Sequence, residues 1–584
     1  MKELKTLLPY FSKYKWRVIA GVLFILLANL FKTYNPVVVR NAINQLIETL
    51  NLSPEISTKN VGKLILSFSA VYLAVSLAEG VFTFFMRQTI IVVSRYIEYD
   101  LKNKLYDHYQ YLDQAFFRRN NTGDLMNRVT EDVSRVRMFL GPSVMYTTNL
   151  VLMFLFASIN MFRVNWQLAL CVLVPMPFLS YFIWKLNSSI NKSSELLQAK
   201  LSDLTTMAQE SYSGIRVIQA YVQEKNMLGF FDKQSEDYKT NSLKLARVEA
   251  IYFPLIMFLV GLSMVIIVLV GGYLNIGGKV TVGNIAEFIL YLNMLTFPMS
   301  ALGWAVALMQ QAAVSMRRIN VFLNEKPTVI NEAGESAKID GKIEFQNVEF
   351  IYPDSGIHAI KNMNFNIAAG QKIAIIGKTG SGKTSIADLC LRMYDVSSGS
   401  ILIDGKDIRE WDTTTLRQSI GYVPQDVFLY SETIEENIRF ANRTSDDIKS
   451  FAKSAAIHSE IERFKEGYET VVGERGVTLS GGQKQRISIA RALAAKPQIL
   501  ILDDCLSAVD ANTEREIETN LKNEMSGKTT IVITHRIFTS IHFDQILVLE
   551  HGKIIEHGTH ETLLENDGFY AHLFRQQRVE QVAV

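Results

Sequence analysis

The first half of the chain contains six apolar stretches, each long enough to cross a lipid bilayer. A helical span needs about 20 mostly apolar residues, because a helix satisfies its own backbone polar groups in hydrocarbon. The stretches lie near residues 16–38, 61–86, 139–162, 165–187, 251–275 and 283–306. We therefore expect a multi-domain membrane protein that begins with an all-α transmembrane domain of six helices over residues 1–323.

The positions of Lys and Arg predict how these helices are oriented. The connections 87–138 and 188–250 are rich in basic residues, whereas the other connections contain few. By the positive-inside rule, both termini and both basic connections are cytoplasmic, as expected of a multi-pass protein of the cell inner (cytoplasmic) membrane. Helical periodicity predicts that the membrane helices continue into the cytoplasm by about 35 Å. A solvated helical hairpin is the alternative for either connection.

Charge and cysteine content exclude several functions. The net charge of +2 gives no support for a nucleic-acid partner. The three cysteines, Cys171, Cys390 and Cys505, are too few and too scattered for a disulfide framework or a metal cluster.

The composition changes after Arg318. Residues 324–341 are polar and are predicted to form a linker, and residues 342–584 alternate strand-like and helical runs, as an α/β domain does. We expect strands at 343–352 and 372–377.

The second predicted strand leads directly into GKTGSGKT, residues 377–384. This is the P-loop pattern, in which backbone N–H groups surround phosphates at a helix N-terminus, Lys383 adds a positive charge and the Thr384 hydroxyl can bind Mg²⁺. The predicted ATP-binding residues of this segment are Gly377, Lys378, Thr379, Gly380, Ser381, Gly382, Lys383, Thr384 and Ser385.

Further motifs follow in a fixed order. LSGGQKQR occupies residues 479–486 and ILILDD occupies 499–504. With the P-loop, these motifs resemble the ATP-binding cassette (ABC) exporters, specifically half-transporters of the multidrug or lipid type with six spans and one α/β P-loop nucleotide-binding domain. The other matching features are Tyr352, Gln425 in YVPQD, GERG at 473–476, SAVD at 507–510 and His535 in ITHR.

The resemblance implies a role for each matching residue. Tyr352 would stack on adenine, and His535 would contact the γ-phosphate. Mg²⁺ would be held by Thr384, Gln425 and Asp503, and Gln425 would also touch the attacking water. Taken alone, Tyr352 could be an ordinary strand aromatic and His535 a core histidine. The signature residues would contact ATP held by the opposite subunit; they are Ser480, Gly481, Gly482 and Gln483.

Asp504 departs from the family pattern, which has a catalytic Glu at this position. The side chain of Asp is one methylene shorter, so the base is withdrawn from the water that it should orient, and we expect slow hydrolysis at this site. The signature is intact and can complete a partner's site. This asymmetry favours the degenerate-site subunit of a heterodimer over a homodimer, with a partner that has Glu at the position of Asp504.

The expected function is ATP-driven export of a small hydrophobic, amphipathic or lipid substrate by alternating access. The alternative is a nucleotide-gated regulatory or channel-like membrane protein with little turnover. Two segments, 116–125 and 211–221, resemble the family's coupling segments, although amphipathic helices that pack on their neighbours would look similar. The candidate polar residues within the spans face either substrate or partners in the bundle; they are Asn29, Lys32, Glu79, Glu287 and Asn293.

Overall fold

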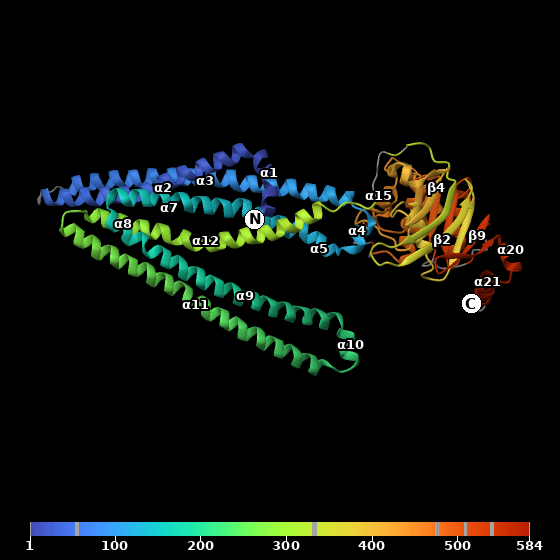
Figure 1. Ribbon diagram of the computed structural model, residues 1–584. Helices are drawn as coiled ribbons and strands as arrows, with labels where there is room; N and C mark the ends of the chain where they lie inside the picture. Colours follow the sequence, from blue (N-terminus) through green and yellow to red (C-terminus); the bar gives the residue numbers. More distant parts are fainter. Residues whose placement is uncertain are drawn as a thin grey trace. The chain divides into compact units, whose positions relative to one another are not determined.

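The computed structural model divides the chain into two compact units (Figure 1). The first contains residues 1–110 and 123–324, and the second contains residues 111–122 and 325–584. The residues whose structure is described are 2–52, 58–329, 334, 336–444, 447–473, 476, 478–506, 511–535, 537 and 542–582. Predicted motif residues 474–475 and 507–510 lie outside the described residues.

The first unit consists of helices. They are η1 (Lys2–Leu7), α1 (Leu8–Lys13), α2 (Lys15–Leu52), α3 (Thr58–Tyr111), α5 (Thr122–Asn127), η2 (Arg128–Asp132), α6 (Val133–Met138), η3 (Phe139–Ser143), α7 (Val144–Val164), α8 (Trp166–Leu173), α9 (Pro175–Ser213), α10 (Ile215–Ala220), α11 (Glu224–Ile276) and α12 (Val282–Leu323).

Helix length confirms that the membrane helices extend beyond a bilayer. Helix α3 has 54 residues and α11 has 53. At about 1.5 Å per residue each is about 80 Å long, whereas the hydrocarbon core is about 30 Å thick. The second predicted coupling segment, 211–221, contains the end of α9 and all of α10 in this unit.

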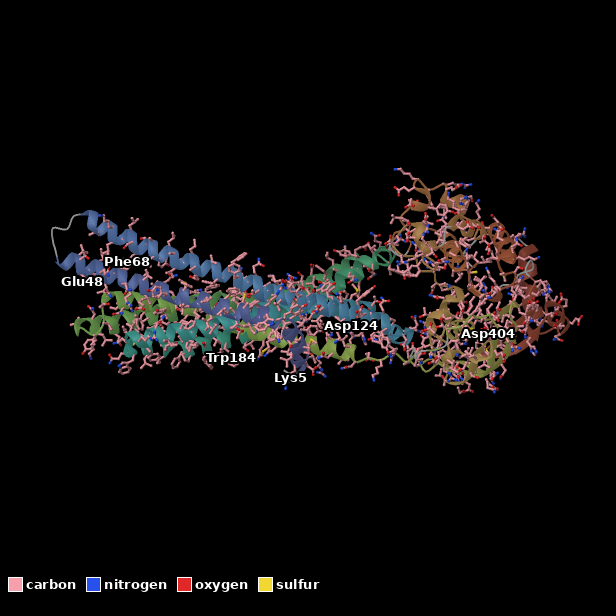
Figure 2. All side chains as sticks on the ribbon, turned by 90° about the horizontal axis from the view of Figure 1, so that it is seen from above. Lys5, Glu48, Phe68, Asp124, Trp184 and Asp404 are labelled. Atoms are coloured by element: carbon pink, nitrogen blue, oxygen red, sulfur yellow. The ribbon has the colours of Figure 1, made fainter. Side chains whose placement is uncertain are left out.

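The number of full spans differs from the prediction. Within the described residues, five helical stretches have the length and apolarity of a span, and they are Lys15–Leu50, Val61–Tyr111, Thr122–Val164, Trp166–Ser213 and Glu224–Ile276. The sixth predicted span, 283–306, corresponds to a shorter apolar stretch, Val282–Thr296, at the start of α12. The prediction ran on through residues 297–302, whose side chains are not described. Large apolar side chains point away from the helices, as at Trp184, which is 67% exposed (Figure 2).

The second unit contains two sheets. A four-stranded antiparallel sheet has the order β2-β1-β4-β5, and a six-stranded sheet has the order β10-β9-β3-β8-β7-β6. In the larger sheet all neighbours are parallel except β10 and β9. The strands are β1 (Ile343–Ile351), β2 (His358–Ile367), β3 (Lys372–Gly377), β4 (Ser398–Ile403), β5 (Lys406–Asp407), β6 (Ile420–Val423), β7 (Ile499–Asp503), β8 (Thr529–Thr534), β9 (Gln545–Glu550) and β10 (Lys553–Gly558). The strands predicted at 343–352 and 372–377 are therefore confirmed as β1 and β3.

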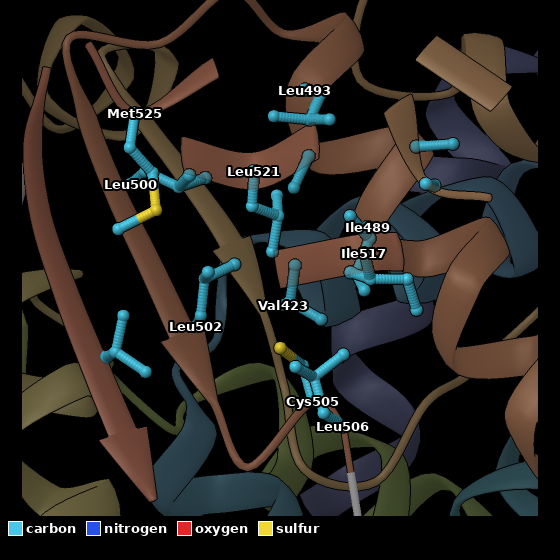
Figure 3. Packing of buried hydrophobic residues seen from close by; sticks show 14 of the residues in the cluster. Val423, Ile489, Leu493, Leu500, Leu502, Cys505, Leu506, Ile517, Leu521 and Met525 are labelled. Carbon is cyan, nitrogen blue, oxygen red and sulfur yellow. The ribbon is translucent and has the colours of Figure 1, made fainter. Parts of the chain in front are cut away.

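Continuous apolar runs explain the parallel sheet. Strands β7 and β8 are buried at every residue, as expected where helices cover both faces of a sheet. Figure 3 shows Leu500 and Leu502 of β7 near Ile489 and Leu521 from two helices. The helices of this unit are α4 (Gln114–Arg119), α13 (Lys383–Cys390), η4 (Ile408–Glu410), α14 (Thr413–Gln418), α15 (Ile434–Arg439), α16 (Ile448–Ser454), α17 (His458–Ile461), η5 (Gly467–Glu469), α18 (Gly481–Ala494), α19 (Ala511–Glu524), α20 (His560–Glu565) and α21 (Phe569–Val582).

Candidate active site

Four neighbouring parallel strands bring the predicted site residues to one edge of the larger sheet. The P-loop follows β3, His535 follows β8, Asp503 ends β7, and Gln425 lies just after β6. Because the carboxyl ends of parallel strands meet at the same sheet edge, these residues converge. They line an open pocket of about 440 Å³, a size typical of small-molecule sites.

The P-loop is held by close backbone packing. A Cβ atom at Gly382, where φ is +98°, would lie 2.4 Å from the carbonyl oxygen of Ala359. The ammonium of Lys383 donates hydrogen bonds of 2.8 Å to the carbonyl oxygens of Gly377 and Lys378. Burial lowers the pKa of Lys383, although Asp503 and Asp504 oppose this shift. The loop therefore places a positive charge in the pocket opposite two carboxyl groups.

Asp503 is a buried carboxyl group, 1% exposed, with one oxygen lacking a partner. Its Oδ2 atom has no hydrogen-bond partner among the described residues. Burial raises the pKa of Asp503 to about 6, and the charge of Asp504 adds to the increase, while a hydrogen bond from Thr384 opposes it. Asp503, the Thr384 hydroxyl and the Gln425 amide line the same pocket. Their oxygen atoms are the kind of ligand that Mg²⁺ prefers.

The Asp504 carboxyl group and the His535 ring lie within hydrogen-bond distance at the same edge. Their Oδ1 and Nδ1 atoms are 2.9 Å apart, with side-chain exposures of 14% and 50%. The backbone of Asp504 has a φ of +46°, in the left-handed region that Asp tolerates better than most residues. Its N–H donates a 2.8 Å hydrogen bond to the carbonyl oxygen of Ile533, which fixes it beside the end of β8.

The pocket contains most but not all of the predicted residues. Its lining includes Tyr352, Thr379, Gly380, Gly382, Lys383, Thr384, Ser385, Gln425, Asp503, Asp504 and His535. Gly377, Lys378 and Ser381 do not line it. The Lys378 ammonium lies 3.7 Å from Glu550 and 5.4 Å from the ring centroid of Phe569, and its side chain is 70% exposed.

The signature residues lie elsewhere in the same unit. Among the described residues that line the pocket, none comes from 480–483. Ser480 caps α18 by accepting from the N–H of Gln483, and the Gln483 side chain accepts from the N–H of Ser480. The Gln483 amide also donates to Glu460, which pairs with Arg486 at 2.6 Å. Glu460 and Arg486 were not predicted, and only their charges could have indicated them.

The pocket also has lining residues that the motifs do not predict. Arg118 enters from α4, which precedes the P-loop by more than 250 positions. The others come from the loop around Tyr352 and β2, and from the β9–β10 turn; they are Ile357, His358, Ala359, Lys361, His551 and Gly552.

Polar residues of the first unit pair with one another to different degrees. Glu287 is fully buried and lies 3.2 Å from Arg40, and buried Asn29 donates to Asn149 at 2.8 Å. Lys32 and Glu79 are 4.0 Å apart and remain 40% and 26% exposed. Glu287 and Asn29 therefore have partners in the bundle, while Lys32 and Glu79 stay accessible.

Asn293 forms a hydrogen bond within its own helix. Its amide donates to the carbonyl oxygen of Ile289, one turn earlier in α12, at 3.0 Å, and the site is exposed.

The chain is similar to known proteins along nearly its whole length. Residues 18–299 match the family described as the ABC transporter transmembrane region, and residues 360–507 match the ABC transporter family. A Bacillus subtilis protein named as a probable multidrug resistance ABC transporter ATP-binding/permease protein is 34% identical over 99% of this chain and 98% of its own. An ATP-dependent lipid A-core flippase of Syntrophus aciditrophicus is 35% identical over 86% of this chain and 84% of its own.

A solved structure supports the same assignment. A bacterial Atm1-family ABC exporter with ATP bound superimposes with a TM-score of 0.76 at 26% identity, covering 96% of this chain and 98% of that one. The helical unit, the P-loop pocket and these similarities agree. The chain is a multi-pass membrane protein that belongs to the ABC transporter family and unites an exporter's transmembrane region and transport ATPase domain.

Proposed function

We propose that this chain exports a hydrophobic or amphipathic substrate by alternating access, driven by ATP hydrolysis in the pocket at the edge of the larger sheet. The observation that carries the proposal is the convergence of Lys383, Asp503 and the Asp504–His535 pair in one pocket of an ABC-family chain. The assigned domains are a transmembrane domain over 1–323, a linker over 324–341 and a nucleotide-binding domain over 342–584. The protein would lie in the cytoplasmic membrane with this last domain in the cytoplasm.

ATP and Mg²⁺ are the proposed ligands of the pocket. Thr384, Gln425 and Asp503 would hold the metal, which when bound neutralises charge on the phosphates. Lys383 would bind the β- and γ-phosphates. The His535 ring would contact the γ-phosphate while Asp504 orients it, and Tyr352 would carry the adenine. Asp504 would accept the proton of the attacking water, slowly because its side chain is short.

The proposed assembly is a dimer in which each signature serves the other chain's pocket. The position of Ser480–Gln483 away from this chain's own pocket supports the proposal. The departure at Asp504 beside an intact signature favours a heterodimer, in which the partner has Glu at the matching position and a departure in its own signature. A homodimer is the alternative.

The proposed substrate is a small hydrophobic molecule or a lipid. The relatives named for multidrug resistance and lipid A-core transport support this class. Within the first unit, Lys32 and Glu79 are the proposed contacts, because a half-exposed charge pair within a membrane segment is costly unless it faces a polar group or a cavity. Glu287 and Asn29 are not proposed contacts.

Transport in inside-out vesicles tests this function. The probes are a fluorescent amphipathic dye and a fluorescent phospholipid, with ATP or a non-hydrolysable analogue. We expect accumulation of at least one probe with ATP only, and none in Lys383→Ala vesicles. Accumulation that is equal with the analogue would instead support a nucleotide-gated channel.

A further inference from the structure

A short segment from the membrane half of the sequence belongs to the ATPase unit. Residues 111–122 cluster with residues 325–584, although the chain on either side of them belongs to the first unit. Ala115 of α4 is 1% exposed in the core formed with β1 and β3. Asp113 caps α4 and accepts from the backbone N–H and the hydroxyl of Thr328. The segment is therefore fixed to the ATPase unit at both its helix start and its buried face.

Arg118 of this segment reaches the aromatic ring predicted to carry adenine. Its guanidinium carbon lies 4.6 Å from the ring centroid of Tyr352, over the ring. Its Nε atom is 3.5 Å from the carboxylate of Asp354. Both Arg118 and Tyr352 line the pocket that contains Lys383. The guanidinium therefore lies over Tyr352 in the pocket that the P-loop also lines.

Three further groups contact Tyr352. Phe350 and Tyr394 contact the ring in edge-to-face geometry, with centroids 4.7 and 5.5 Å away. The Tyr352 hydroxyl is 2.8 Å from the Ser385 hydroxyl, at the start of α13. A planar base that stacks on the face of the ring covered by Arg118 would meet its guanidinium, because both groups use the same flat π surface.

We propose that Arg118 and the adenine of ATP compete for the Tyr352 ring, so that nucleotide binding releases α4 from its contact with the pocket. This inference rests on the proposed role of Tyr352 and goes beyond it, because it makes residues 111–122 respond to the base rather than to the phosphates. The contacts to be broken are one cation–π contact and one partly exposed ion pair, so we expect removal of Arg118 to tighten ATP binding by about three- to tenfold.

The test compares Arg118→Ala with Arg119→Ala in the full-length protein in lipid nanodiscs. Both substitutions remove one positive charge from α4. The Arg119 guanidinium bonds the carbonyl oxygen of Ala115 in its own helix and does not line the pocket. Two probes are measured by equilibrium binding with Mg²⁺, namely ATP and inorganic tripolyphosphate, which lacks the base.

Competition for the ring predicts that Arg118→Ala binds ATP about three- to tenfold more tightly and tripolyphosphate no more tightly, while Arg119→Ala changes neither. In a Tyr352→Ala background, Arg118→Ala should give no gain for ATP. Arg118→Gln, which keeps polar contacts without the charge, should show the same gain and serves if the Ala variant is unstable. Unchanged or weaker ATP binding by both Arg118 variants, or an equal gain for tripolyphosphate, would overturn the proposal. Failure of the proposed function would give a different result, because ATP binding by the wild-type protein would then be unaffected by removal of Lys383.

Discussion

The pocket and the signature segment, two parts of one ATPase unit, are built in different ways. The pocket collects side chains from four strand ends and contains a buried carboxylate oxygen with no partner among the described residues. At the signature, Ser480 and Gln483 already bond each other, and Gln483 also donates a hydrogen bond to Glu460. A buried polar group without a hydrogen-bond partner indicates a ligand site, whereas buried polar groups that bond one another indicate a rigid support. The difference is consistent with the proposal that the pocket binds this chain's nucleotide, while the signature is a preformed surface for the nucleotide of another chain.

Replacing Lys383 should give the largest effect. Lys383→Ala removes the charge that faces Asp503 and Asp504, and we expect nucleotide binding and ATPase activity to fall by about a hundredfold or more. Lys378→Ala is the matched control, because the Lys378 ammonium contacts Glu550 rather than the loop carbonyls. Its effect should stay below about twofold. Equal losses in the two variants would contradict the assignment of Lys383 to the pocket.

The signature should separate hydrolysis from binding. Gly481→Asp places a negative charge at the N-terminus of α18, where the helix tolerates it but another chain's triphosphate would not. We expect ATPase activity to drop by about a hundredfold with nucleotide affinity within about twofold of wild type. Affinity is measured by equilibrium binding and turnover by phosphate release. A parallel loss of affinity would mean that the signature contributes to its own chain's pocket.

Acidic pH should lower the Mg²⁺-dependent affinity of the pocket for ATP. Because the pKa of Asp503 is raised to about 6, its carboxyl is protonated below that pH and cannot serve a metal ion. Mg²⁺-dependent ATP affinity should therefore rise with pH up to about 6 and then level off, by up to about tenfold per pH unit below it. Asp503→Asn is the control for titration of ATP itself and should lack this component. An identical pH profile in Asp503→Asn would contradict the assignment of Asp503 as a metal ligand.

Removing Glu460, which contacts the signature, should have the smallest effect of these substitutions. Glu460→Ala leaves Arg486, which is 8% exposed, without its carboxylate, and we expect about 1–2 kcal/mol lower free energy of unfolding of the ATPase unit. Glu462→Ala removes a carboxylate that is 58% exposed beside His458 and should change stability little. Denaturant unfolding followed by tryptophan fluorescence compares the two. Similar stabilities in both variants would mean that Glu460 does not hold the signature.

Local patterns predicted much of this arrangement. The apolar run of β3 and the glycines after it predict a strand that leads into a phosphate-binding loop. The strand and the loop could be predicted because each is determined by residues that are adjacent in the sequence. Long-range contacts escaped prediction. Nothing in the sequence around Lys378 shows that its side chain turns to Glu550, and nothing around Arg118 places it over Tyr352.

The membrane half shows the same limit. Hydropathy identified the spans but could not distinguish Glu287, which pairs with Arg40, from Glu79, which stays partly exposed beside Lys32. For the sixth predicted span, 283–306, the described apolar stretch is Val282–Thr296, and the side chains of residues 297–302 are not described.

The most direct test of the account is the ATPase rate of Asp504→Glu. The longer carboxylate restores the reach of the base while Lys383, Asp503 and His535 stay in place. The backbone at this position is left-handed, which suits Glu less well than Asp, so thermal stability is measured alongside. Asp504→Asn is the control, because it keeps the size of the side chain without a base.

We predict that Asp504→Glu raises hydrolysis at this site by at least about tenfold and that Asp504→Asn lowers it, with ATP affinity unchanged in both. In a heterodimer, the partner's own Glu is neutralised so that only this site is measured. A rate that does not rise in a stable, ATP-binding Asp504→Glu protein would contradict the account, and would place the limit on turnover in the opposing signature instead of in Asp504.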